Sequence, residues 1–102
     1  ALITASKKGN ATCVQLLIDA KANFERKDKE GKTALMKAAE KGHTECAQSL
    51  INAKANLRAQ DKDNKTALMW AVLNGNCECV RLLADAKADL NMVDLNSRTA
   101  LI

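Results

Sequence analysis

The sequence predicts an all-α fold built from stacked helix-turn-helix units with projecting loops, and three observations lead to this prediction. First, the chain of 102 residues repeats itself every 33 residues. Second, 47% of the residues are apolar but only 2% are aromatic. Such a composition favours helices, because sandwiches and barrels need β-branched and aromatic residues. Third, proline is absent from the whole chain.

The 33-residue period appears in several short motifs that recur without a gap. Thr-Ala-Leu begins at Thr33, Thr66 and Thr99. Other residues keep the same step: Gly9, Gly42 and Gly75; Cys13, Cys46 and Cys79; Asp28, Asp61 and Asp94. We therefore divide the single domain of residues 1–102 into a partial repeat 1–27, repeats 28–60 and 61–93, and a partial repeat 94–102.

Each unit predicts two short antiparallel helices followed by a polar connector. In the second unit, Thr33 is a suitable N-cap for the first helix, and Gly42 ends that helix. One unit cannot bury its own apolar face, so the units must stack. The expected helix pairs are 2–8 with 11–20, 34–41 with 44–53, and 67–74 with 77–86, and the connectors are at about 21–33, 54–66 and 87–99.

The motif of the second unit resembles the ankyrin repeat. It reads Asp28-x-x-Gly31-x-Thr33-Ala34-Leu35-x-x-Ala38-Ala39-x-x-Gly42-His43-x-Glu45. The period of 33 residues and the two-helix unit agree with this family, and the resemblance covers the whole chain. It implies an ankyrin-repeat solenoid with projecting β-hairpin-like loops and a role in binding other proteins. The partner must be inferred from the surface, since a fold alone does not define a function.

The chain departs from the family pattern at positions where the backbone needs special freedom. The glycine expected after each second helix is replaced by Lys21, Lys54 and Lys87. If these residues adopt a left-handed conformation, each costs about 1 kcal/mol relative to glycine. The loop glycine is kept at Gly31, and asparagine, which tolerates that conformation, replaces it at Asn64, whereas serine at Ser97 suits it less well.

The sequence offers no pattern for catalysis, a cofactor or a metal, so we expect none of them. It has no Gly-rich phosphate loop, and His43, the only histidine, has no nucleophile at a recognisable spacing. The resemblance places His43 in the turn that starts the second helix. Cys77 and Cys79 point to different faces of a helix, which argues against a shared metal. The residues expected in the core include Cys13, Cys46, Cys79, Leu17, Leu50 and Leu83.

The sequence favours a reducing compartment, the cytoplasm or alternatively the nucleus. It contains four cysteines but lacks the basic start, apolar stretch and cleavage site of a signal peptide. It also lacks a run of 18 or more apolar residues, so no membrane span is expected.

The charges predict a polarised surface, although the formal net charge is only +4. In ankyrin-like stacks, partners usually meet a concave face built from the loop tips and the first helices. Ten basic and three acidic residues map to this face, which leaves the remaining surface with more acidic than basic residues. The face comprises Lys7, Lys8, Lys27, Lys29, Glu30, Lys32, Lys37, Glu40, Lys41, Lys62, Asp63, Lys65 and Arg98.

An apolar pair interrupts this basic face. Trp70 and Leu73 lie three residues apart on one predicted helix face, where the preceding repeat has Lys37 and Glu40. Tryptophan is enriched at the centres of interfaces, so Trp70 is a candidate anchor for an acidic partner protein. The alternative is that Trp70 folds over a neighbouring loop. The candidate partner-binding residues are Trp70, Leu73, Lys37, Lys41, Lys62, Lys65, Lys29, Lys32 and Arg98.

Other functions stay open alongside protein binding. The same lysines could bind nucleic acid or anionic lipid, although the scarcity of stacking aromatics and of arginine on this face disfavours nucleic acid. The chain could also be a structural segment of a longer or engineered array. Its two ends both read Ala-Leu-Ile, at residues 1–3 and 100–102, and this similarity predicts weak head-to-tail self-association.

Overall fold

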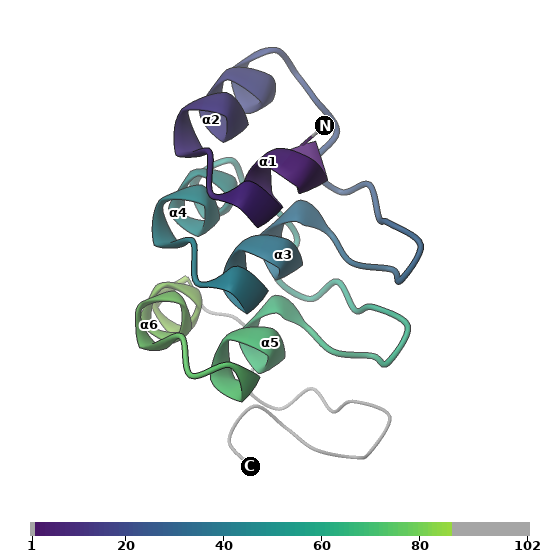
Figure 1. Cartoon of the computed structure of the whole chain (residues 1–102), viewed down its shortest axis with the longest axis vertical. Coiled ribbons are helices and arrows are strands. Elements are labelled where there is room, and N and C mark those ends of the chain that lie inside the picture. The colour runs from purple at the N-terminus through teal and green to yellow at the C-terminus, as the bar shows by residue number, and fades with distance from the viewer. Residues whose placement is uncertain (1, 87–102) are drawn as a thin grey trace.

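The computed structural model describes residues 2–86, and these residues form three helix pairs (Figure 1). The predicted helix boundaries are confirmed to within one residue. The helices are α1 (Leu2–Lys8), α2 (Ala11–Asp19), α3 (Ala34–Lys41), α4 (Thr44–Asn52), α5 (Ala67–Leu73) and α6 (Cys77–Asp85). Within this part of the chain, no helix is both long and apolar enough to span a membrane.

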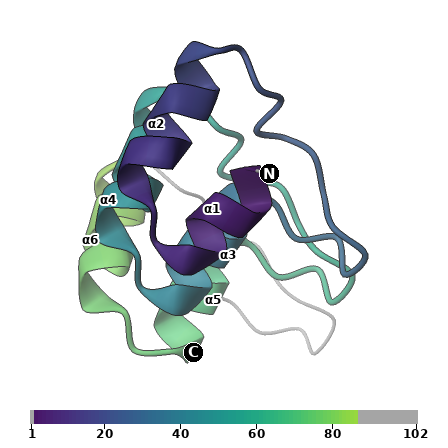
Figure 2. The ribbon, with the colours of Figure 1, turned by 45° about the horizontal axis from the view of Figure 1, so that its top comes forward.

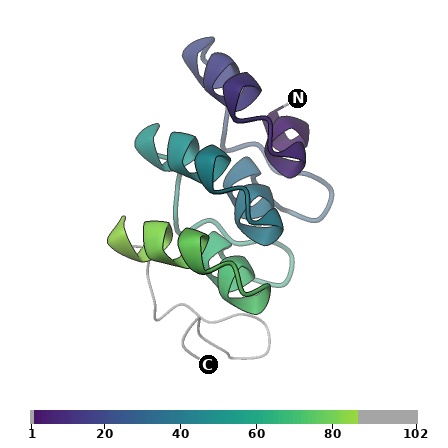
Figure 3. The same cartoon turned by 60° about the vertical axis from the view of Figure 1, so that its left-hand side comes forward.

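The helices form two layers, with loops projecting from one side (Figures 1 and 3). The first helix of each pair contacts the first helix of the next pair, so that α1, α3 and α5 form one layer. The second helices, α2, α4 and α6, form the other layer in the same way. The loops that follow α2 and α4 project past the layer of first helices (Figure 2). The predicted helix-turn-helix solenoid is therefore confirmed.

The first helices start and stop where the sequence predicts. The Thr33 hydroxyl accepts a hydrogen bond from the Met36 backbone N–H at 3.3 Å, and Thr66 caps α5 at the same distance. These caps satisfy one of the backbone donors that every helix start leaves free. Gly42 ends α3 in the left-handed conformation, with a φ of 75°.

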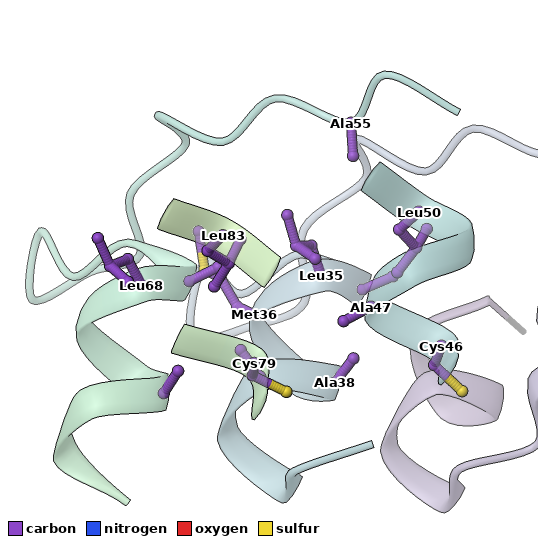
Figure 4. Close-up of a cluster of buried hydrophobic side chains, with 14 of the residues drawn as sticks. Leu35, Met36, Ala38, Cys46, Ala47, Leu50, Ala55, Leu68, Cys79 and Leu83 are labelled. Atoms are coloured by element: carbon purple, nitrogen blue, oxygen red, sulfur yellow. The ribbon is translucent and has the colours of Figure 1, made fainter. Parts of the chain in front are cut away.

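The core lies between the two helix layers and between neighbouring repeats (Figure 4). Leu50, Leu83, Cys46 and Cys79 are almost completely buried, as predicted. Burial raises the pKa of the Cys46 and Cys79 thiols, although a hydrogen bond with the Thr44 side chain acts in the opposite direction at Cys79. These thiols therefore remain protonated core groups at neutral pH.

The first repeat does not follow this pattern, so the predicted burial of Cys13 and Leu17 is wrong. Cys13 is exposed and Leu17 is only half-buried. The contact between Cys79 and Thr44 shows that residues at this repeat position face the preceding second helix. On α2 the corresponding face points out of the stack, and in the described part of the chain no further helix covers it.

The lysines that replace the family's glycine do adopt the left-handed conformation. The φ angles are 70° at Lys21 and 71° at Lys54, and Asn64 takes the left-handed role of the loop glycine with a φ of 59°. The corresponding predictions for the last repeat fall outside the described residues. They concern Lys87, Ser97 and Arg98, as well as Leu101 and Ile102, on which the prediction of head-to-tail association depends.

Replacing Leu50 by alanine tests the assignment of the core. Because Leu50 is fully buried, we expect Leu50→Ala to lower the free energy of unfolding by about 2–5 kcal/mol. Leu17→Ala is the matched control in the half-buried equivalent position and should cost less. Urea unfolding followed by circular dichroism measures both variants, and equal losses would show that the two positions are packed alike.

Replacing Lys54 by glycine tests the strain at the end of the second helix. We expect Lys54→Gly to raise the free energy of unfolding by about 0.5–1 kcal/mol, because glycine relieves the left-handed strain but is more flexible when unfolded. Gln15→Gly, in the middle of the exposed side of α2, should instead destabilise by about 0.5–1 kcal/mol. A destabilised Lys54→Gly variant would contradict the assignment of backbone strain to Lys54.

Candidate partner-binding face

The candidate site is the surface on which the first helices meet the projecting loops, which we call the inner face. In each of the two described loops, an aspartate closes the tip. One oxygen of Asp28, Oδ1, accepts hydrogen bonds from the N–H groups of Glu30 and Lys32, each at 2.9 Å. The Oδ1 atom of Asp61 accepts two corresponding bonds in the next loop. This arrangement, in which an aspartate side chain organises its own turn, leaves the tip residues exposed.

The second oxygen of each aspartate ties the loop to the first helix that follows it. Asp28 Oδ2 lies 3.6 Å from the Lys37 ammonium. Asp61 Oδ2 accepts a hydrogen bond from the Trp70 indole N–H at 2.8 Å. Lys37 and Trp70 are 33 residues apart, so a lysine and a tryptophan perform the same structural role in successive repeats.

Neighbouring loops are also linked to each other by hydrogen bonds. The Lys62 N–H donates to the Glu30 carbonyl at 3.0 Å, and the Lys27 ammonium donates to the Gln60 carbonyl at the same distance. Each repeat therefore fixes the loop of the next, so the loop tips keep a defined spacing.

Lys32 joins the second repeat to the third. Its ammonium lies 3.1 Å from Glu40 Oε1 and 4.1 Å from the centre of the Trp70 ring, and the side chain is only 9% exposed. The Lys65 ammonium lies 5.6 Å from the same ring. A cation this close to an indole face is attracted by the ring's quadrupole, more strongly when water is excluded.

These contacts correct part of the surface predicted from the sequence. Lys32 and Lys37 are buried, with relative exposures of 7% and 9%, and both are paired with carboxylates. Trp70 is half-buried and packs against the Asp61 loop, as in the alternative given above. Sequence periodicity places Lys37 and Trp70 on the correct helix face, but it does not show that a loop folds over them.

The exposed part of the inner face remains basic. Glu40 and Lys65 are half-buried, and Arg98 lies outside the described residues. Of the other residues predicted here, six exposed lysines compare with two exposed carboxylates, those of Glu30 and Asp63. The exposed lysines are Lys7, Lys8, Lys27, Lys29, Lys41 and Lys62.

The C-terminal ends of the first helices are held in line by side chains of the following repeat. His43 Nε2 donates a hydrogen bond to the Lys7 carbonyl at 2.9 Å, and Asn74 Nδ2 donates to the Glu40 carbonyl at 3.0 Å. His43 is the N-cap residue of α4, as expected, although its side chain makes no capping hydrogen bond there. A side chain at Gly9 would place its Cβ within 2.7 Å of the imidazole, so this position needs glycine.

At the end of α5 an exposed apolar residue, Leu73, lies next to the basic ends of the other first helices. Leu73 is 57% exposed and follows Val72, which is 38% exposed. Leu73 has Glu40 as its counterpart in the preceding repeat, and the bond from Asn74 to the Glu40 carbonyl places the two helix ends side by side. Leu73, and not Trp70, is therefore the apolar side chain of the predicted pair that is largely accessible.

The described residues include no group of three or more histidine, cysteine or acidic side chains arranged to hold a metal. Cys77 is exposed and Cys79 is buried, so the pair points to different faces, as predicted. A hollow of about 440 Å³ is lined by Leu2, Leu17 and Phe24 at the first repeat, away from the basic helix ends.

The Asp28 carboxyl gives the loop network a measurable dependence on pH. Partial burial raises its pKa, but hydrogen bonds from the Lys32 and Glu30 N–H groups and the Lys37 charge more than offset this and lower the pKa. The ionised group thus stabilises the fold above the unfolded-state pKa of about 3.9. This stabilisation disappears as the pH falls through the lower folded-state pKa.

Asp28→Asn tests this dependence, because the substitution removes the charge and retains a similar shape. The parent should be more stable than the variant at pH 7, and this difference in unfolding free energy should shrink as the pH falls below about 4. Urea unfolding of both proteins across this range measures the difference. A difference that stays constant with pH would contradict the proposed ionic contribution of Asp28.

Comparison with known families agrees with this geometry. The family model described as Ankyrin repeats (3 copies) matches residues 2–101, which is essentially the whole chain. A comparison with curated proteins found no significant match. Ankyrin repeats generally act as protein–protein interaction modules, and their fold is not an enzymatic one. With its period, helix pairs and matched length in agreement, the chain belongs to the ankyrin repeat family.

Proposed function

We propose that the chain binds an acidic partner protein through the exposed lysines of the inner face. The observation that carries this proposal is the excess of exposed lysines over exposed carboxylates on the described part of this face, where the two buried lysines are paired internally. A surface of one charge attracts a partner of the opposite charge and accelerates association.

The exposed lysines supporting this proposal form two rows along the stack. Lys29 and Lys62 occupy the same position in successive loop tips, and Lys8 and Lys41 occupy the same position at successive helix ends. Each pair is related by the 33-residue repeat, so its members lie one repeat apart. An elongated acidic surface could engage several of these lysines together.

The face suits a protein partner better than single-stranded nucleic acid. Proteins that bind single-stranded nucleic acid use aromatic side chains on which the bases stack. Here one face of the only aromatic residue assigned to the inner face, Trp70, is covered by Lys32. The contacts of lysine with phosphate are also less specific than the two-pronged contacts of arginine.

A triple charge reversal tests the proposal. Lys8→Glu, Lys41→Glu and Lys62→Glu should together weaken binding of a captured partner at least about tenfold, chiefly through slower association, and flatten its salt dependence. Lys21→Glu, Lys54→Glu and Arg81→Glu make the same change in net charge on exposed residues at or near the second helices and form the control. The partner is first captured with the intact chain, and surface plasmon resonance then compares the three proteins.

Two outcomes would overturn this proposal. Equal losses in the triple variant and in the control would show that binding depends on net charge and not on the inner face. Tighter binding of a single-stranded oligonucleotide or of anionic vesicles than of the captured protein, measured at the same salt concentration, would favour the other ligand classes.

A further inference from the structure

The ends of the first helices, which we call the helix-end row, carry a gradient from basic to apolar. The row begins with Lys7 and Lys8 on α1, continues with Lys41 at the end of α3, and finishes with Leu73 on α5. All four side chains are exposed. A surface with this asymmetry distinguishes the two orientations of a bound segment.

We propose that the helix-end row binds an extended acidic segment of the partner in one fixed orientation. An apolar residue of the segment contacts Leu73, and carboxylates contact Lys41 and then the lysines of α1. This inference rests on the proposed function and deepens it, because it names the kind of segment bound and its direction along the stack.

The row is a continuous surface because hydrogen bonds hold its helix ends together. His43 binds the Lys7 carbonyl and so fixes the end of α1 beside the turn after α3. Asn74 binds the Glu40 carbonyl at 3.0 Å and fixes α5 beside α3. Asn76 Nδ2 adds a bond of 2.7 Å to the Ala39 carbonyl. The order Lys8, Lys41, Leu73 is therefore a spatial order on packed helices.

The neighbouring strip of the inner face cannot compete for the same carboxylates. The Lys32 ammonium already contacts Glu40 and the Trp70 ring, and Lys37 is paired with Asp28. Both lysines are at most 9% exposed. An incoming carboxylate near the first helices therefore meets the exposed ammonium groups of the helix-end row.

The repeat spacing predicts the pattern of the bound segment. Packed helices lie about 8–10 Å apart, and an extended chain advances about 3.3 Å per residue. Adjacent repeats are thus about three residues apart along an extended segment. The expected pattern is an apolar residue, an acidic residue three positions away, and a second acidic residue about three positions further.

Synthetic peptides test this pattern directly on the whole 102-residue chain. The probe has a leucine and two glutamates at these spacings on a serine background, and a second probe has the same composition with the leucine placed between the two glutamates. We expect the first probe to bind at least about fivefold more tightly than the second, because only its order matches that of Leu73, Lys41 and the lysines of α1. Replacing the leucine by serine, or both glutamates by glutamine, should weaken the better probe about tenfold.

Variants of the chain identify where the leucine of the probe binds. Leu73→Ser should weaken binding of the better probe about tenfold. The same substitution should not change the affinity of the probe in which serine replaces the leucine. Leu16→Ser is the matched control, because Leu16 is a leucine on α2 with a similar exposure of 62%. Circular dichroism checks that both variants remain folded, which is expected for exposed positions.

The outcomes separate this inference from the proposed function. If the triple charge reversal abolishes partner binding but Leu73→Ser binds the probe like the parent, the fixed orientation is wrong and the acidic partner stands. Equal affinity of the two probes would overturn the orientation as well. If the charge reversal has no effect on the captured partner, the proposed function itself fails.

Discussion

The inner face depends on one aspartate in each loop. Asp28 and Asp61 use one oxygen to close the loop and the other to hold a side chain of the following first helix. A carboxylate can accept several hydrogen bonds at once, so a single residue fixes both the loop shape and its angle to the helix. Without this link, the lysines at the loop tips would have no defined position relative to those at the helix ends.

This link also explains why the charged side chains in the middle of the inner face are paired with one another, whereas those at its edges are exposed. Lys37 balances the Asp28 carboxylate, while Trp70 donates to Asp61 without bringing a charge. Lys32, from the preceding repeat, places its ammonium over the indole ring. An unpaired charge is costly to bury, so the lysines that remain exposed are those beyond the reach of these internal partners.

The period, helix bounds and caps were predictable because each depends on local sequence, as at Thr33 and Gly42. The left-handed lysines were predictable for the same reason, since the repeat alignment places Lys54 where the chain must turn. The exposure of Cys13 and the burial of Lys32 depend instead on what packs against them from another repeat. A periodic pattern makes equivalent positions look alike, so it does not predict differences between a covered repeat and the first one.

Cross-repeat hydrogen bonds give the inner face a further property that matters for binding. The loops are joined through Lys62 and Glu30, and the helix ends through His43 and Asn74, so both borders of the face are fixed before a partner arrives. Ordering a surface during association costs free energy, and a surface that is already ordered avoids much of that cost. The free energy that remains to be spent is that of ordering the lysine side chains and the partner segment. Short charged contacts, which are weak individually, can therefore add up to specific binding on this scaffold.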